Sequence, residues 1–176
     1  MAEKKRSTAE TVWNAAKGTM YQTAYDVLKN RADAEDAVMD AMERIVKNER
    51  KFSGLGEADM RALSSIYVRY TAINRYNRNA KEPYPMEELP EDAGIPDVSP
   101  EDTFLSEESC TRIVSAIRAL PPSCRDVLLL CARYGMRPRE AAAVLHIPAG
   151  AVRTRLSRAR ALLREILENE NGGDSG

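Results

Sequence analysis

The chain of 176 residues is interrupted by one acidic, proline-rich stretch that limits what it can fold into. Residues 82–108 contain ten acidic side chains, five prolines and no lysine or arginine. Proline fixes φ and removes a backbone donor, and clustered carboxylates repel one another, so this stretch disfavours long helices and strands. We therefore predict a flexible acidic linker at 82–99. It separates an N-terminal unit at 8–81 from a C-terminal unit at 100–168, which a disordered tail follows at 169–176.

The overall charge balance hides a basic remainder. The chain has 26 basic and 27 acidic residues, so the part outside residues 82–108 carries a net charge of +9. Charged residues make up 30% of the chain. No stretch approaches the roughly 20 apolar residues that a bilayer span needs, and no apolar core of a secretory signal is visible. We expect a cytoplasmic protein that does not insert into a membrane.

The cysteines and the single histidine give little sign of catalysis. Cys110, Cys124 and Cys131 lack metal-ligand spacing, and in a reducing compartment they are interpreted as small core residues, with a redox or metal role as the alternative. His146 is interpreted as a turn residue rather than a ligand or catalyst, because histidine tolerates positive φ better than most residues. No metal or cofactor is expected.

Hydrophobic periodicity predicts an all-α fold that begins with a bundle of three helices in the N-terminal unit. A capping box at Ser7 starts the first helix, which ends near Asn30. Asp33 is the predicted cap of the second helix, and the third spans about 57–79, after a break with two glycines. The predicted buried stripes are Trp13, Ala16, Met20, Ala24 and Val27 in the first helix, Ala34, Ala37, Ala41 and Ile45 in the second, and Leu63, Ile66, Tyr67, Tyr70 and Ile73 in the third.

The C-terminal unit is predicted to contain four helices. The first begins at Ser99–Pro100, with a cap residue followed by proline, and ends before Pro121. The second ends at Gly135, a natural C-terminal cap. The third runs over 138–145 and the fourth over about 149–168. The sequence has no strand pattern and no internal repeat.

The last two predicted helices have the spacing of a helix-turn-helix. Small or apolar side chains would fill the space between them: Ala142, Leu145, Ile147, Val152 and Leu156. The last helix then exposes a basic face. Thr154, Ser157 and Arg158 are placed to contact base edges in a major groove, whereas Arg153 and Arg155 flank them and suit phosphates. The alternative is an ordinary amphipathic helix with solvated arginines.

A second basic stretch, residues 61–81, contains five cations and no acid, with tyrosines and asparagines between them. This pattern suits single-stranded DNA, because bases stack on aromatic rings while cations follow the backbone. Tyr67 and Tyr70 could equally be part of the bundle core.

The two units together resemble a bacterial RNA polymerase sigma factor of the extracytoplasmic-function (ECF) group in the sigma-70 family. In the C-terminal unit, residues 119–127, 139–142 and 150–160 are similar to region four, the reader of the minus-thirty-five promoter element. In the N-terminal unit, residues 34–38 are similar to the polymerase-docking helix of region two. Residues 51–54 and 72–76 resemble the loop and helix that melt and read the minus-ten element.

The resemblance implies a non-catalytic subunit that binds core RNA polymerase, places it at a promoter and holds the opened non-template strand. The polymerase-binding residues would be Glu35, Asp36 and Asp40. The residues on the single-stranded minus-ten side would be Phe52, Tyr70, Asn74, Arg75 and Arg78. Those on the duplex minus-thirty-five side would be Arg153, Thr154, Arg155, Ser157 and Arg158. An anti-sigma factor is a further candidate partner, and the free protein is expected to be a monomer.

Five residues depart from the family pattern. One is His146, at a turn position that is commonly glycine. Met39 and Met42 replace the glutamine and the aromatic residue common on the docking helix, and Leu63 stands where tryptophan is usual. Tyr70 occupies a position often held by asparagine, which bears on the minus-ten base preference. The acidic linker resembles the segment that such factors thread through the basic RNA path of the polymerase, with solubility through self-repulsion as the alternative.

Two other functions fit parts of the sequence. A helix-turn-helix regulator with an N-terminal dimerisation or sensing bundle explains 100–168 equally well, and it predicts stable dimers on palindromic half-sites. It does not explain the docking-helix match or the basic stretch at 61–81. A small helical enzyme would use Glu35, Asp36 or Asp40 as acid and base. The sequence offers no glycine-rich phosphate loop and no recognisable nucleophile elbow, so we expect no enzyme.

Overall fold

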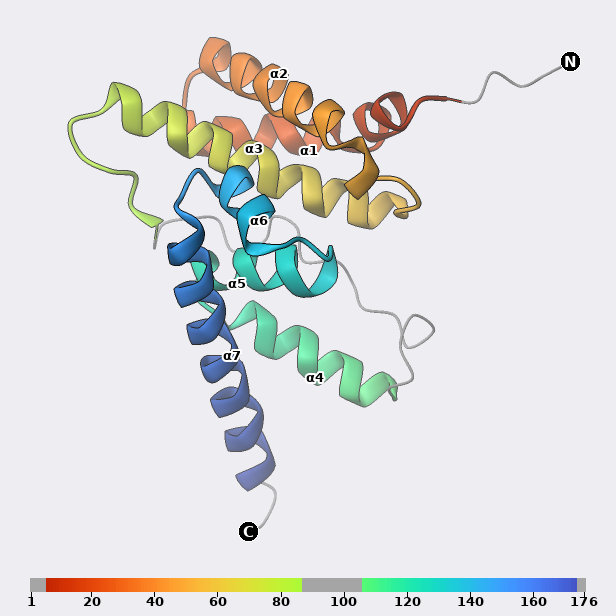
Figure 1. Cartoon of the computed structure of the whole chain (residues 1–176), viewed down its shortest axis with the longest axis vertical. Helices are drawn as coiled ribbons and strands as arrows, with labels where there is room; N and C mark the ends of the chain where they lie inside the picture. The colour runs from red at the N-terminus through yellow and green to blue at the C-terminus, as the bar shows by residue number, and fades with distance from the viewer. Residues whose placement is uncertain (1–5, 87–105, 174–176) are drawn as a thin grey trace, which may run out of the picture. The chain divides into compact units, whose positions relative to one another are not determined.

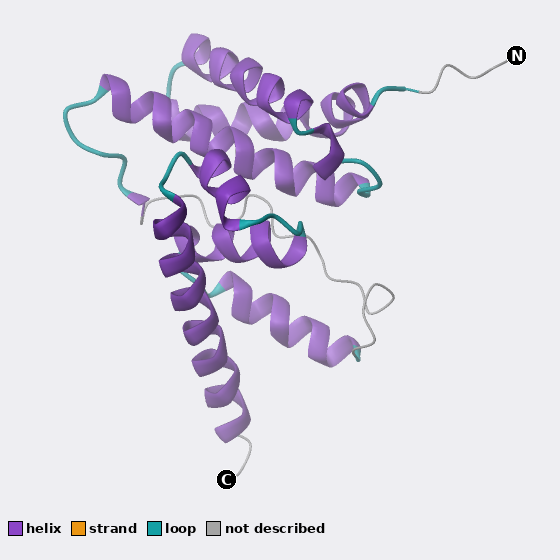
Figure 2. Cartoon of the chain, in the orientation of Figure 1, coloured by secondary structure: helices purple, strands orange, loops and turns teal. Residues whose placement is uncertain are grey.

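The computed structural model describes residues 6–86 and 106–173, and every regular element in these ranges is helical (Figure 2). The chain divides into two compact units. The N-terminal unit is built mainly from α1 (Thr8–Leu28), α2 (Arg31–Lys47), the short 3-10 helix η1 (Glu49–Lys51) and α3 (Glu57–Asn79). The C-terminal unit is built mainly from α4 (Glu107–Arg118), α5 (Pro122–Leu128), the π-helical turn η4 (Leu129–Arg133), α6 (Pro138–Leu145) and α7 (Ala149–Gly172). The all-α prediction is confirmed for the described residues.

Local side-chain caps start the first two helices. The Ser7 hydroxyl accepts a hydrogen bond from the Glu10 backbone N–H at 3.1 Å, as the capping-box pattern predicts. The predicted cap of the second helix is wrong. Asn30 caps α2, because its Oδ1 accepts from the Asp33 backbone N–H at 2.9 Å, and the Asp33 side chain is left for another contact.

The core of the N-terminal unit lies where α1, α2 and α3 pack against one another (Figure 1). The predicted stripes of α2 and α3 are buried, and the small alanines of α2 allow close approach of the helices. The α1 stripe contains one error. Trp13 is 36% exposed, while Val12 is fully buried in its place, so the inward face of α1 begins one residue earlier than predicted.

The first described helix of the C-terminal unit is α4. Ser106 caps α4 by accepting from the Ser109 backbone N–H at 3.2 Å, whereas the predicted start at Ser99–Pro100 lies outside the described residues. The chain turns after η4 at Gly135, whose φ of +64° confirms the predicted glycine turn.

Helix α7 packs against α5 and α4 within this unit (Figure 1). It continues to Gly172, so the predicted disordered tail from residue 169 is wrong for residues 169–172. Arg112 on α4 contacts this last turn of the helix. Its Nη2 donates to Asn171 Oδ1 at 2.6 Å, and its Nε lies 3.6 Å from Glu170 Oε2.

The predicted linker at 82–99 is only partly described. Residues 87–99 lie outside the described ranges, but Tyr84 is attached to α3 through Asn77. The chain therefore stays in contact with α3 for several residues after the helix ends. None of the described helices is long and apolar enough to cross a membrane.

Candidate functional site

The helix-turn-helix formed by α6 and α7 is held together by local backbone geometry. Glu140 Oε2 accepts from the Arg137 backbone N–H at 2.8 Å, which fixes the start of α6. At the turn, His146 adopts a φ of +54°, as predicted for this position. The Ile147 N–H then donates to the Ala142 carbonyl at 3.2 Å, which closes the turn before α7 begins.

The two faces of α7 differ as the sequence predicts. Val152, Leu156 and Ala159 are buried and fix the orientation of the helix within its unit. The outward-facing candidate residues are Arg153, Thr154, Ser157 and Arg158, which are exposed, and Arg155, which is half-buried. All five are therefore on or near the surface of the first three turns of α7.

The arginines on the outer face of α7 are not neutralised within the described part of the chain. Arg153, Arg155 and Arg158 form no ion pair with any residue in ranges 6–86 and 106–173. The hydroxyl of the exposed Thr154 donates to the Gly150 carbonyl at 3.1 Å. The start of α7 thus presents a positive surface of the kind that meets DNA phosphates and base edges.

The predicted polymerase-binding carboxylates lie on α2 and remain accessible. Glu35 Oε1 accepts from Arg31 Nε at 3.1 Å, one turn away on the same helix. The side chains of Asp36 and Asp40 are 64% and 54% exposed. The structure brings Asp36 and Asp40 together with a third carboxylate, Asp33, which the sequence indicated only as a helix cap.

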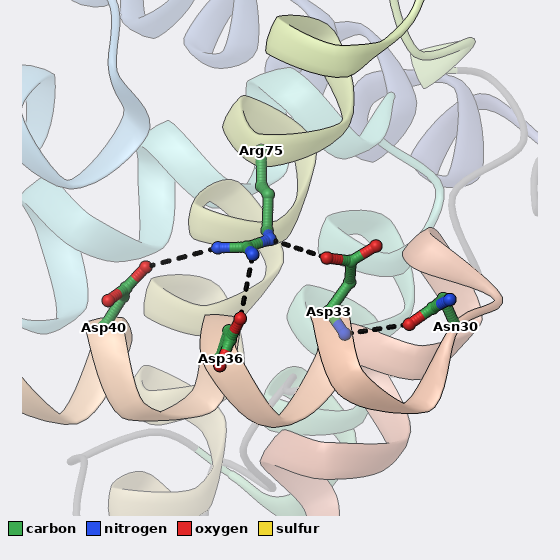
Figure 3. Close-up of polar contacts among 5 residues, drawn as sticks. All are labelled: Asn30, Asp33, Asp36, Asp40 and Arg75. Atoms are coloured by element: carbon green, nitrogen blue, oxygen red, sulfur yellow. Dashed lines mark hydrogen bonds and ion pairs between the residues drawn. The ribbon is translucent and has the colours of Figure 1, made fainter.

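The guanidinium of Arg75, on α3, joins these three carboxylates (Figure 3). Its Nε donates to Asp33 Oδ1 at 3.2 Å, its Nη2 to Asp36 Oδ2 at 2.9 Å, and its Nη1 lies 3.8 Å from Asp40 Oδ2. The Arg75 side chain is only 22% exposed. Its predicted role as a minus-ten DNA contact is therefore not supported, because its charge is directed at α2 and ties α3 to that helix.

Two other predicted minus-ten residues are also core residues. Phe52 is fully buried, with its ring 5.5 Å from that of Tyr67, and Tyr70 is 4% exposed. Neither ring can stack on a base without leaving the core, so their burial does not support the predicted contacts with DNA. Asn74 is half-buried and Arg78 exposed, which leaves these two near the surface at the C-terminal end of α3.

The cysteines are placed as small core side chains. Cys110 and Cys124 are buried, and Cys131 is half-buried. Burial raises the pKa of the Cys131 thiol, with nearby Arg160 acting in the opposite direction. Among the described residues, no group of three or more histidine, cysteine, aspartate or glutamate side chains is placed to hold a metal ion.

The sequence of this chain is similar to that of known proteins. The model of the family described as "Sigma-70, region 4" matches residues 110–163, which include the helix-turn-helix. The ECF RNA polymerase sigma factor SigW of Bacillus subtilis is 30% identical over 167 residues, which cover 87% of this chain and 85% of SigW. The ECF RNA polymerase sigma factor SigE of Mycolicibacterium smegmatis is 29% identical over 153 residues, 84% of this chain, and the chain spans 57% of that relative's length.

One solved structure is also similar. The sigma factor RpoE of Bartonella quintana, in complex with the anti-sigma factor NepR, is 18% identical, and the match covers 86% of this chain and 91% of that one. The TM-score is 0.38, which is too low to support an inference about either unit.

Proposed function

This chain belongs to the ECF RNA polymerase sigma factors, and from that premise we propose that it binds core RNA polymerase and directs it to specific promoters. In this role it is a non-catalytic subunit that acts in the cytoplasm, where the polymerase works. The observation that carries the proposal is the basic face of α7, whose Arg153, Arg155 and Arg158 have no ion pair among the described residues. This face belongs to a helix-turn-helix inside the segment that the region 4 model matches.

The minus-thirty-five element is the proposed ligand of α7. Ser157 and Arg158 lie on the exposed face within the first three turns, where a recognition helix reaches base edges in the major groove. Arg153 and Arg155 flank them and are proposed to contact phosphates, which set the register of the helix on the duplex.

Core polymerase is the proposed ligand of α2. Asp36 and Asp40 lie on the side of α2 that meets α3, where Arg75 contacts them, but more than half of each side chain stays exposed and is accessible to a cationic partner. Glu35 extends this acidic surface, with Arg31 as its neighbour. A basic surface on the polymerase would complement these carboxylates and align α2 on it.

The minus-ten element is the proposed ligand of the C-terminal end of α3, through Asn74 and Arg78. An anti-sigma factor remains a candidate partner of the whole chain. The main alternative, a helix-turn-helix regulator, differs in one physical respect. It would act as a dimer on palindromic DNA without polymerase.

Transcription of genomic DNA tests the proposal directly. Core polymerase from the source bacterium is supplied with or without the chain, and the RNA 5′ ends are mapped. We expect new start sites that share two upstream sequence elements. Start sites identical to those of core polymerase alone would contradict the proposal.

A matched pair of variants tests the polymerase surface. Asp36→Asn combined with Asp40→Asn should lower the affinity for core polymerase about tenfold, because partly exposed interface charges contribute of this order. Glu10→Gln removes an exposed charge from α1 in the same unit and should change nothing. Equal affinities for the double variant and the unmodified chain would show that α2 is not the docking surface.

A further inference from the structure

The segment that follows α3 folds back onto the end of that helix. The Tyr84 backbone N–H donates to Asn77 Oδ1 at 2.8 Å. The Tyr84 ring meets the Tyr76 ring edge to face, with centroids 5.2 Å apart and an interplanar angle of 89°. Both rings are half-buried, so each keeps part of its surface exposed to solvent. They form an aromatic pair at the surface, in contrast to the buried Phe52.

The sequence around Tyr84 restricts its backbone before any ligand arrives. Pro83 has a φ fixed by its ring, and a residue that precedes proline, as Tyr84 precedes Pro85, is confined to extended conformations. The hydrogen bond to Asn77 anchors the same residue to α3. Since little backbone freedom is left to lose, a ligand that contacts the Tyr84 ring pays a small entropic cost.

Polar and basic side chains lie next to this ring. Asn77 and Arg78 follow Asn74 by three and four residues, so both lie beside it on the surface of α3. Asn77, Arg78 and Lys81 are exposed. The guanidinium of Arg75 is directed at the aspartates of α2 (Figure 3). Within residues 6–86 and 106–173, neither Arg78 nor Lys81 forms an ion pair.

We propose that Tyr84, supported by Tyr76, is a stacking platform for an unpaired base of single-stranded DNA whose phosphates contact Arg78 and Lys81. The ring offers a π-face to the base, and the cations follow the backbone on either side. This inference rests on the proposed function and supplies the minus-ten side with the exposed aromatic group that Phe52 and Tyr70 cannot provide. It also gives a role to the proline-flanked tyrosine at the start of the acidic linker.

The test separates stacking from charge by using two single strands with the same backbone. Full-length chain bound to core polymerase is titrated with fluorescently labelled oligothymidylate and with an abasic oligonucleotide of equal length, and core polymerase alone supplies the baseline. The unmodified complex should prefer the strand that carries bases. Tyr84→Ala should lower the affinity for oligothymidylate about tenfold and leave the abasic strand unaffected. Tyr84→Phe keeps the ring and should behave as the unmodified chain.

A variant that removes a charge complements the variants of the ring. Arg78→Gln should weaken both strands, since phosphates are common to them. Equal affinity of the unmodified complex for the two strands would overturn the platform, and so would an equal loss on both strands in Tyr84→Ala with an unchanged thermal unfolding midpoint. Co-elution of the chain with core polymerase is scored in the same preparations. If the chain does not co-elute with core polymerase, the proposed function itself is contradicted. If it co-elutes and Tyr84→Ala binds both strands as the unmodified chain does, only the stacking platform is rejected.

Discussion

Helices α3 and α7 are both rich in arginine, but the structure uses their charges differently. On α3, Arg61 Nη1 pairs with Glu57 Oε1 at 2.7 Å, and Arg75 is shared among three aspartates of α2. On α7, Arg153 and Arg158 are exposed and form no ion pair in the described part of the chain. A count of basic residues therefore matches the exposed positive charge of α7 and overstates that of α3.

The difference originates in the neighbouring helices. Asp33, Asp36 and Asp40 on α2 are spaced three and four residues apart, so they form one row on the side that meets α3. Helix α7 packs against α5 and α4 through its apolar face, and its outer face meets no carboxylate row in the described residues. What a basic helix can bind depends on the acidic groups that the fold places beside it.

The largest expected effect tests whether the aromatic residues near α3 belong to the core. Phe52→Ala should lower the free energy of unfolding by about 3–5 kcal/mol, because it leaves a cavity against Tyr67. Chemical denaturation measures this change. Phe52→Leu, which refills most of the space, should cost much less and leave single-strand binding intact. A Phe52→Ala variant of normal stability that fails to bind single-stranded DNA would contradict the assignment of Phe52 to the core.

The next effect compares an arginine of α7 with one of α3. Arg158→Ala should lower the affinity for a mapped minus-thirty-five element by about 1–3 kcal/mol without changing stability, if this side chain reads a base. Arg61→Ala, the control, removes a cation already paired with Glu57 and should leave duplex binding unchanged. Fluorescence anisotropy with mapped and scrambled duplexes measures both. An equal loss on the two duplexes would make Arg158 a phosphate contact.

The Arg75 cluster should have a smaller effect, and on stability rather than on duplex binding. Arg75→Ala leaves three carboxylates of α2 close together and should cost about 1 kcal/mol, since the pairs are partly exposed and screened. Thermal unfolding at low and high salt checks the sign, because the cost should shrink as salt screens the pairs. A cost that is independent of salt would show that Arg75 acts through packing instead.

The smallest effect concerns the end of α7. Arg112→Ala removes the contacts to Glu170 and Asn171 and should destabilise the fold by only a few tenths of a kcal/mol. Hydrogen exchange should nonetheless speed up in residues 169–172, while the first turns of α7 keep their protection. Unchanged exchange in residues 169–172 would show that the contacts of Arg112 do not stabilise the end of α7.

The sequence allowed the helices to be placed more accurately than their contacts. Periodicity and caps predicted α3, α6 and the start of α7, because such signals are local. The Arg75 cluster and the Arg112 contacts join residues 35 to 59 positions apart, and no local pattern encodes them. The burial of Phe52 and Tyr70 was not predictable for a related reason. Aromatic residues among cations look alike in a core and on a stacking surface until the fold shows which rings are covered.

Co-elution of the purified chain with core RNA polymerase on size exclusion, without DNA, is the most direct test of whether this chain is a polymerase subunit. We expect a one-to-one complex. The double variant Asp36→Asn with Asp40→Asn should weaken it, and Glu10→Gln should leave it unchanged. A chain that elutes apart from the polymerase as a stable dimer would contradict it and favour a helix-turn-helix regulator.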